Sequence, residues 1–349
     1  MTEKIAGKVT ETDAGTDTGT DAGASPGTVA GTVADKIKVA VVGTGGIGGY
    51  FGGRLAAAGH DVGFVARGAH LAALRESGLT VDSAAGDFAV AHVHATDDTR
   101  DIGEVDFVLL CVKTWQLPPA IAALKPLVGP GTAVVTLQNG VEAPEQVAAE
   151  VGRDAVLPGT AKIIAHLDGP GRVRHVGGPA SLAFAEWDDR ASDRVARLRA
   201  ALTGASVSTA APEDIWAELW AKFLFVVPFG GLGTVADAPF GVLRSRPGTR
   251  QLLVDGMTEI QRVASALDVR LPDDIVDRTL DFIDQQPAEG TSSLQRDILS
   301  GRPSELDAWN GSVVRLGERT GTPTPVNRYL YEVASVLATR SPQGAAPTT

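Results

Sequence analysis

The hydrophobic pattern divides the chain into two kinds of segment. Short apolar runs of strand length alternate with stretches of helical length as far as about residue 211. From residue 212 the strand-like runs stop, and helical periodicity continues to about residue 337. Alternating strands and helices are typical of an α/β domain with helices on both faces of a parallel sheet. We therefore predict a doubly wound, mostly parallel sheet domain followed by an all-α domain.

The predicted elements set the domain boundaries at 36–211 and 212–340. The predicted strands are 39–42, 61–66, edge strands within 79–93, 105–112, 132–137, pieces within 155–186, and 207–210. The predicted helices are 47–58, 69–77, 118–127, 190–202, 212–236, 249–267, 273–284, 294–300, 304–318 and 325–337. Residues 1–35 are mostly Thr, Asp, Gly, Ala and Val in near-repeats without aromatics, which predicts a disordered tail. Residues 341–349 are predicted to be a loose end.

A glycine-rich turn follows the first strand. Gly43, Gly45 and Gly48 match G-x-G-x-x-G between a buried strand and a helix. Gly43 allows the tight turn, Gly45 lets the backbone approach a pyrophosphate, and Gly48 lets helix and strand pack closely. The free N–H groups at the helix start, around Gly46 and Ile47, then face the phosphates. A plain glycine-rich turn is the alternative, but the strand before and the helix after favour a Rossmann domain that binds a dinucleotide.

Three polar residues follow predicted strands at the ligand-binding edge of such a sheet. Arg67 ends the second strand, about twenty residues past the glycines. An acid there would suit the ribose of NAD, whereas an arginine suits the 2′-phosphate of NADP, so we predict NADPH over a merely solvated arginine. Lys113 and Asn139 follow later strands and are placed toward the cofactor crevice. Asn139 precedes Gly140, so a tight turn explains it equally well.

Composition excludes several classes of partner. The net charge of −11 and the pI near 5.0 argue against nucleic-acid or membrane-surface binding. Cys111 is the only cysteine, which excludes an intrachain disulfide and suits a reducing, cytoplasmic location. We expect it to be a buried structural thiol. The chain has no run of eighteen apolar residues, so no membrane span is predicted.

Lys222 lies in a segment that is otherwise apolar. Ile215, Leu219 and Val226 share its helical stripe, so apolar side chains surround the ammonium group. Desolvation lowers the pKa of a lysine toward the range useful for proton transfer. A side chain that extends to solvent is the alternative. We favour a catalytic lysine because the stripe has only this one charge.

Glu305 has a structural explanation when it is considered alone. Ser304 is a typical N-cap with Asp307 at the capping-box position, which would place Glu305 in the first helical turn. The helix dipole favours acids there. Ser292 and Ser293, before the preceding predicted helix, could likewise act as caps.

Together, these residues lie in strings that resemble the ketopantoate reductase (2-dehydropantoate 2-reductase) family over about residues 37–337. The strings are the glycine turn and residues 113–116 (KTWQ), 138–140 (QNG), 217–222 (AELWAK), 292–293 (SS) and 304–311 (SELDAWNG). The resemblance implies NADPH-dependent reduction of a 2-oxo acid to a 2-hydroxy acid, with ketopantoate to pantoate, in pantothenate biosynthesis, as the default. It implies Lys222 as the general acid and Glu305 as a group that orients substrate or lysine. It also implies that Ser293 holds the substrate, and that Asn139 and Lys113 line the cofactor and substrate crevice.

The chain departs from this family in one place. Ketopantoate reductases usually carry asparagines four and eight positions after the catalytic lysine, where they hydrogen-bond the substrate. Val226 and Gly230 stand at those positions here. Losing polar contacts from a buried site predicts a changed substrate, with a less polar tail than ketopantoate. Pro228 between them is expected to bend the helix.

Several functions remain in competition. Within the family, the alternative to ketopantoate is a related oxo acid or imine in a specialised pathway. A non-catalytic NADP-binding regulator is disfavoured because a pure binder needs no buried acid group such as Lys222. A 3-hydroxyacid dehydrogenase has a similar domain order but lacks the strings above. The predicted partner is a small 2-oxo acid and no metal site is predicted, while a homodimer is left open.

Overall fold

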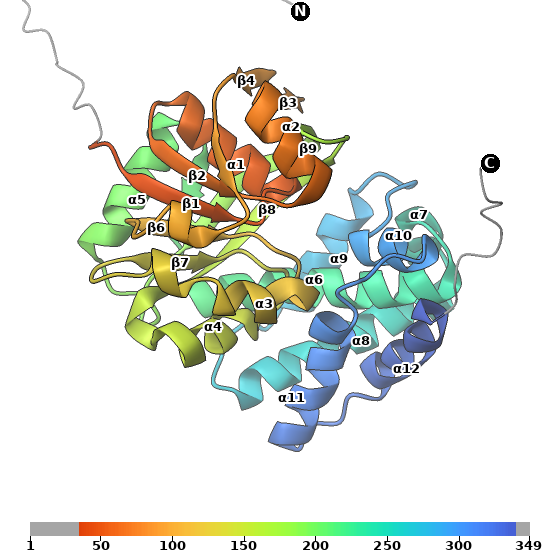
Figure 1. The fold of residues 1–349 in the computed structure, drawn as a ribbon. Coiled ribbons are helices and arrows are strands. Elements are labelled where there is room, and N and C mark those ends of the chain that lie inside the picture. The colour runs from red at the N-terminus through yellow and green to blue at the C-terminus, as the bar shows by residue number, and fades with distance from the viewer. Residues whose placement is uncertain (1–34, 340–349) are drawn as a thin grey trace, which may run out of the picture. The chain divides into compact units, whose positions relative to one another are not determined.

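The structure is a computed structural model that describes residues 35–339. Apart from Asp35, the predicted tail (1–35) and the predicted loose end (341–349) lie outside the described residues. Within the described residues, the first part of the chain forms a ten-stranded sheet flanked by helices, and the second part is helical (Figure 1).

The sheet is mostly parallel. Its strands are β1 (Lys38–Val42), β2 (Asp61–Val65), β3 (Leu79–Ser83), β4 (Phe88–Val90), β5 (His94–Thr96), β6 (Phe107–Leu110), β7 (Ala133–Thr136), β8 (Val156–Leu167), β9 (Arg172–Phe184) and β10 (Ser208–Ala210). Their order is β4-β3-β9-β8-β7-β6-β1-β2-β5, with β10 paired to β9. Among the strands of residues 35–339, only the β3–β4 and β8–β9 pairs are antiparallel. In the parallel register Val42 lies between Val65 and Leu110, so β1, β2 and β6 end at one edge.

The central strands are continuously apolar because helices cover both faces of the sheet. These helices are α1 (Gly46–Ala57), α2 (Gly68–Ser77), α3 (Leu117–Ala122), α4 (Ala143–Val151) and α5 (Asp193–Gly204). Val39 and Val41 of β1 pack in the core shared with α1, α2 and α5. Ala40 and Val42 pack in the opposite core, with α3 and α4 (Figure 1). Alternate residues thus enter different cores, and the predicted doubly wound sheet is confirmed.

The second part of the chain packs around one long helix. Its helices are α6 (Ile215–Ala236), α7 (Phe240–Ser245), α8 (Pro247–Ala266), α9 (Ile275–Asp284), α10 (Ser293–Leu299), the π-helical turn η5 (Asp307–Gly311), α11 (Ser312–Thr320) and α12 (Pro325–Ala338). α6 contacts α8, α10 and α12, and it also reaches β8 of the sheet. The predicted all-helical second region is therefore confirmed for the described residues.

α6 owes its apolar composition to this central place. By length and composition it could cross a membrane, since its most apolar window has a mean hydropathy of 1.5, but 67% of that window is buried inside the fold. Glu218 and Lys222 also interrupt it. A helix that is hydrophobic on most sides is expected at the centre of a helical core. α6 remains helical through Pro228 from end to end.

Several predicted elements differ from those observed. α4, α7 and β5 were not predicted. β5 and α7 are short. α4 combines alanines with acids and has little apolar periodicity. The predicted helix 118–127 is divided into α3 and a separate 3₁₀ turn, Lys125–Leu127. The predicted helix 304–318 starts three residues later, as η5, and no side chain caps it. The predicted Ser304 N-cap is therefore wrong, because Asp307 pairs with Arg315 on α11 instead.

Candidate active site

Two of the three motif glycines are required by packing. Gly43 has a φ of +97°, and a Cβ atom placed on it would lie 2.7 Å from the Val112 nitrogen. A Cβ atom on Gly48 would lie 2.2 Å from the Gly43 carbonyl oxygen and 2.8 Å from Val41 Cγ1. Cβ atoms do not approach other atoms this closely, so any larger residue would push helix and strand apart. The roles expected of these glycines in the turn and in helix–strand packing match this geometry.

The remaining glycine of the motif faces open space. No atom lies within 4 Å of a Cβ atom placed on Gly45. α1 begins at the next residue, without a side-chain cap and without an acid in its first turn, and Ile47 is its second residue. Gly46 is close-packed, since its Cβ would lie 2.5 Å from the Ala165 carbonyl oxygen on β8. An open glycine before an uncapped helix N-terminus is the arrangement that fits a dinucleotide phosphate.

Arg67 lies directly after β2, at the N-cap of α2. It is exposed, and within residues 35–339 its side chain makes no hydrogen bond or ion pair. The end of β2 lies beside the glycine turn, because the Gly43 and Thr44 N–H groups donate to the Val65 carbonyl at 3.4 and 3.3 Å. The guanidinium group is therefore available to an anion at the crevice edge.

Lys113 and Glu305 form an ion pair between the sheet region and the helical region, with the lysine partly exposed and the carboxylate buried. Lys113 Nζ donates to Glu305 Oε2 at 3.0 Å, and the Thr114 N–H donates to Oε1 at 3.2 Å. The Glu305 side chain is 3% exposed. Asp297 Oδ2 also lies 3.6 Å from Lys113 Nζ. Two neighbouring residues, Lys113 and Thr114, thus hold the Glu305 carboxylate. Lys113 and Glu305 are 192 positions apart in sequence.

Lys222 reaches from α6 toward the sheet. Its Nζ donates to the Ala161 carbonyl oxygen on β8 at 2.6 Å. Burial lowers the pKa of Lys222 to about 8, while the negative charge of Glu305 acts in the opposite direction. Lys162 lowers that pKa further, although it is itself paired with Glu218 at 2.5 Å. The expected desolvated lysine is therefore present, with the Glu305 charge acting on it.

Asn139 and Ser293 lie on different elements of the fold. Asn139 follows β7 and is partly buried. Ser293 is the first residue of α10, and the cap of that helix is Ser292, whose hydroxyl accepts the Gln295 N–H at 3.0 Å. The predicted capping role therefore applies to Ser292 alone, and the Ser293 hydroxyl is not used for it.

Val226 and Gly230 contribute no polar group to α6. Val226 is partly buried one helical turn after Lys222, and Gly230 is buried a further turn along. A Cβ atom on Gly230 would meet the indole of Trp309 at 2.6 Å. Gly230 therefore faces packed protein atoms and is not exposed to an open cavity.

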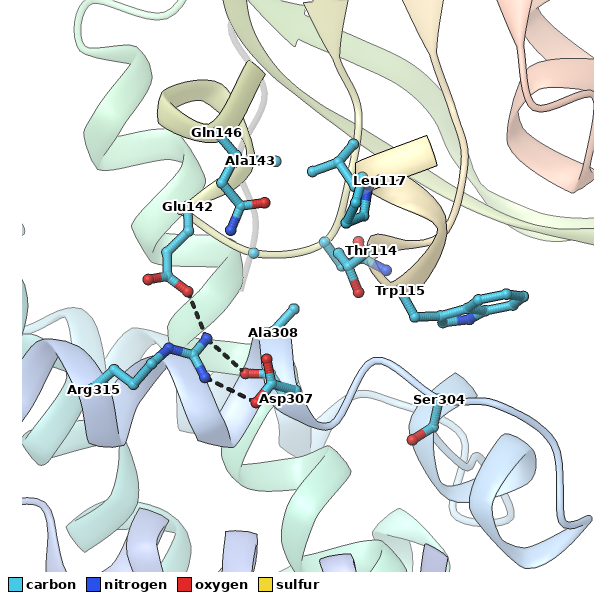
Figure 2. A pocket seen from close by; sticks show the side chains of 13 residues that line it. Thr114, Trp115, Leu117, Glu142, Ala143, Gln146, Ser304, Asp307, Ala308 and Arg315 are labelled. Atoms are coloured by element: carbon cyan, nitrogen blue, oxygen red, sulfur yellow. Dashed lines mark hydrogen bonds and ion pairs between the residues drawn. The ribbon is translucent and has the colours of Figure 1, made fainter. Parts of the chain in front are cut away.

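A cleft of about 270 Å³ opens beside the Lys113–Glu305 pair. It is lined from the sheet side by Thr114, Trp115, Leu117, Asn139 and Gln146, and from the helical side by Ser304, Asp307 and Ala308 (Figure 2). Arg315 connects the two sides, since it donates to Glu142 at 2.8 Å and to Asp307 at 2.9 Å (Figure 2). Lys222 does not line this cleft. The cleft therefore lies where the sheet region meets the helical region, next to the Lys113–Glu305 ion pair.

His70, which no sequence pattern predicted as a site residue, ties the glycine turn to the β8–β9 hairpin. His70 Nδ1 accepts the Gly171 N–H at 2.9 Å, so Nε2 carries the proton and donates to the Thr44 carbonyl at 2.7 Å. Burial lowers the pKa of His70, which favours this neutral form. A single histidine in a helical stretch gave no signal, and neither did Asp297 beside Lys113.

Comparisons with known proteins agree with this arrangement. The family model described as ketopantoate reductase PanE/ApbA matches residues 39–189, and its C-terminal counterpart matches residues 214–338. A 2-dehydropantoate 2-reductase of Mesorhizobium japonicum is 31% identical, over 83% of this chain and 94% of that protein. A solved PanE/ApbA family ketopantoate reductase of Ralstonia eutropha is 32% identical, with a TM-score of 0.80, over 86% of this chain and 98% of that chain.

A more distant structure shares the fold alone. The ternary structure of D-mandelate dehydrogenase with NADH and anilino(oxo)acetate has a TM-score of 0.79 at 22% identity, over 86% of this chain and 98% of that chain. The family models, the M. japonicum relative and the R. eutropha structure confirm the resemblance seen in the sequence, and with it an oxidoreductase. The chain belongs to the ketopantoate reductase family of NAD(P)-dependent, 2-dehydropantoate 2-reductase-like enzymes.

Proposed function

We propose that the protein reduces a 2-oxo acid to the 2-hydroxy acid with NADPH, with Lys222 as the general acid. Ketopantoate, reduced to pantoate for pantothenate biosynthesis, is the default substrate. The observation that supports this most is the partly buried Lys222, whose pKa burial lowers to about 8. A group with such a pKa is still largely protonated near neutral pH and gives up its proton readily.

The reduction needs one hydride and one proton. NADPH supplies the hydride when it is bound. The Lys222 ammonium gives its proton to the carbonyl oxygen, so that the C=O group becomes C–OH and the lysine is left neutral. An ammonium group has three donors, and the Ala161 carbonyl takes one of them. The remaining donors are free to point at a substrate oxygen while this contact fixes the position of Nζ.

We propose that Glu305 orients the groups around this lysine. Its carboxylate is held by Lys113 Nζ and by the Thr114 N–H, so its charge has a fixed place. That charge favours the protonated form of Lys222 against the effect of burial. Lys113 and Asn139 would then line the crevice toward cofactor and substrate, and Ser293 would hold the substrate.

The proposed cofactor site uses the glycine turn and Arg67. Gly45 has open space beside it, and the first N–H groups of α1, at Gly46, Ile47 and Gly48, are free to bind phosphate oxygens. The exposed Arg67 would pair with a 2′-phosphate, which favours NADPH over NADH.

A family member with a different substrate is the second candidate. The apolar Val226 and the side-chain-free Gly230 favour it, because a buried substrate hydroxyl would have no partner there. A related oxo acid or imine with a less polar tail is therefore the alternative to ketopantoate.

We further propose domain boundaries at 36–211 and 212–340, a cytoplasmic location, and the absence of nucleic-acid or membrane partners.

The test is NADPH oxidation with a panel of 2-oxo acids that includes ketopantoate. We expect turnover with at least one of them and production of the matching 2-hydroxy acid. NADPH binding without oxidation of NADPH by any acid of the panel would favour the regulator alternative. Turnover that persists in Lys222→Ala would remove the general-acid role.

A further inference from the structure

Arg315 joins two parts of the chain that meet beside the cleft. From α11, its Nη2 donates to Glu142 Oε2 at 2.8 Å, and its Nη1 donates to Asp307 Oδ1 at 2.9 Å. Nη2 also donates to the Asp307 carbonyl oxygen at 3.0 Å. Glu142 lies at the N-cap of α4 in the sheet region, whereas Asp307 begins η5 in the helical region. One planar guanidinium group therefore connects the two regions (Figure 2).

Two hydroxyl groups complete the same hydrogen-bond network. Ser312 is fully buried, and its hydroxyl donates to Glu142 Oε2. The Tyr331 hydroxyl donates to Asp307 Oδ1 at 3.1 Å. The carboxylates of Glu142 and Asp307 thus each accept from Arg315 and from one further side chain. Groups held by several partners at once have little freedom to shift, so the network fixes the start of η5 against the segment before α4.

The Asp307 end of this network is close to Glu305 in the chain. Within η5, the Trp309 N–H donates to the Glu305 carbonyl oxygen at 3.0 Å, so the backbone of this turn holds the backbone of Glu305. On the sheet side, the turn after β7 lies against η5, because a Cβ atom on Gly140 would lie 3.3 Å from the Ala308 carbonyl oxygen. A shift of η5 relative to the sheet would therefore move Glu305 as well.

The network is more exposed than the carboxylate that it holds in place. The side chains of Arg315 and Asp307 are 43% and 73% exposed, whereas that of Glu305 is 3% exposed. Exposed ion pairs contribute little to stability, because water screens them. We therefore expect the network to matter more for the position of η5 than for the free energy of unfolding.

We propose that Arg315 is a positioning residue for the reaction and acts through Glu305. The inference rests on the proposed reduction of a 2-oxo acid at Lys222. The hydrogen bonds of Arg315 within residues 35–339 include none to Glu305 or Lys222. Arg315 fixes η5, and η5 keeps the Glu305 carboxylate where it binds Lys113 and where its charge acts on Lys222. Small displacements of such groups lower turnover strongly.

The experiment compares the unmodified protein with Arg315→Met, Arg315→Lys, Glu305→Gln and the double variant Glu305→Gln/Arg315→Met. The measurement is kcat and KM with NADPH across neutral and alkaline pH, for a 2-oxo acid that the unmodified protein reduces. Thermal unfolding midpoints are measured for every protein. Arg250→Met is the matched control, because Arg250 forms a two-point ion pair with Asp284, at 2.7 Å for both contacts, that lies wholly within the helical region.

The pH profile distinguishes positioning from a general loss of structure. The charge of Glu305 raises the pKa of Lys222, so its displacement should lower the pH above which kcat/KM declines. We expect the largest downward shift in Glu305→Gln and a smaller one, of about half a pH unit, in Arg315→Met. The double variant should shift no further than Glu305→Gln alone. Lys162 and Glu218, the other charges that act on Lys222, are the same in all these proteins.

The rates should follow the same order. We expect kcat to fall by about tenfold in Arg315→Met, with a smaller change in KM. Arg315→Lys keeps the charge but cannot bind both carboxylates in the same way, so it should retain part of the lost activity. Arg250→Met should leave kcat and the pH profile unchanged, whatever its melting temperature.

Several results would overturn the inference. An unchanged kcat and pH profile in Arg315→Met would show that the network positions nothing that the reaction needs. A further downward shift in the double variant would show that Arg315 does not act through Glu305. Equal kinetic losses in Arg250→Met would point to general destabilisation.

A separate measurement covers failure of the proposed function. If no 2-oxo acid is reduced, the lysines are labelled competitively with acetic anhydride and read by mass spectrometry of the peptides. Lys113, the partner of Glu305, should then react faster in Arg315→Met than in the unmodified protein or in Arg250→Met. Unchanged labelling of Lys113 would show that Arg315 does not position Glu305.

Discussion

The glycine turn after β1 and the glycines near the end of α6 differ in what faces them. Next to Gly45 there is open space, at the uncapped start of a helix. Next to Gly230, Gly231 and Gly233 lie side chains of the protein itself, from Trp309, Asn310 and Gln295. A glycine beside empty space makes room for a ligand, whereas a glycine beside a packed side chain makes room for another part of the chain. The two halves of the proposed site thus use the same residue type for opposite purposes.

Lys222→Ala should have the largest effect, because it removes the proposed acid from the helical half and leaves the cofactor half intact. We expect turnover to fall by about 10²–10⁴-fold. NADPH affinity, measured by the change in cofactor fluorescence on binding, should remain close to that of the unmodified protein. A matching loss of NADPH affinity would mean that the variant damages the fold or that the two halves are not separable in this way.

Gly48→Ala and Gly45→Ala should separate packing from binding within the glycine turn. The first places a Cβ atom 2.2 Å from the Gly43 carbonyl, so we expect a loss of about 1–3 kcal/mol in the free energy of unfolding. The second meets no protein atom, so thermal stability should hold while NADPH affinity falls. Denaturant unfolding and cofactor titration measure the two effects. Equal stability losses would remove the distinction between the two glycines.

The pH dependence follows from the lowered pKa of Lys222. As the acid, the lysine must be protonated, so kcat/KM should decline as pH rises through about 8. Stability should change in the other direction. Between about 8 and the ordinary lysine pKa the unfolded chain binds more protons than the folded one, so Lys222 lowers stability at neutral pH and this cost disappears as pH rises. Lys222→Met should therefore melt above the unmodified protein at pH 7, and this advantage should shrink in alkaline buffer.

Arg67→Ala tests the proposed cofactor site beside the glycine turn. The exposed guanidinium is proposed to meet only the 2′-phosphate, so NADPH binding should weaken by about 1.5–3 kcal/mol while NADH binding stays nearly unchanged. Titration with both cofactors measures the difference, and Arg67→Lys, which keeps the charge, should retain part of the preference. Equal losses for NADPH and NADH would contradict the assignment.

The fold could be predicted from sequence largely because its signals are local. The apolar run at β1, the glycine spacing and the change to helical periodicity each lie within a short window. α4 and α7 were missed because their helices are short and depend on packing against neighbours rather than on their own pattern. The start of η5 was misplaced because Asp307 has a partner on another helix, Arg315, which no local rule contains.

The residues of the proposed site could be named from the sequence, but the contacts that they make could not. A single charge in an apolar stripe made Lys222 a candidate, yet its contact with Ala161 joins residues 61 positions apart. Glu305 looked like a helix-dipole acid, and only the structure brings it to Lys113. The sequence shows only that Gly230 has no side chain. The indole that fills the space beside it belongs to Trp309, which is distant in sequence. Long-range pairing of this kind depends on the fold as a whole, so no local pattern encodes it.

Val226→Asn should have the smallest effect on activity. It tests whether the side chain one turn after Lys222 contributes to substrate preference. Val226 lies on α6 one turn after Lys222, and its side chain is partly buried. An asparagine there is similar in size to valine and adds an amide, so the fold should tolerate it with little change in melting. A new hydrogen bond to the hydroxyl of ketopantoate would be worth about 0.5–1.5 kcal/mol, roughly a twofold to tenfold shift in the kcat/KM ratio of ketopantoate to its analogue without the hydroxyl. Val226→Thr, which adds a hydroxyl to the same shape, is the matched variant and should shift the ratio less. If neither variant moves the ratio, the side chain at 226 does not face the substrate, and discrimination would have to come from other residues.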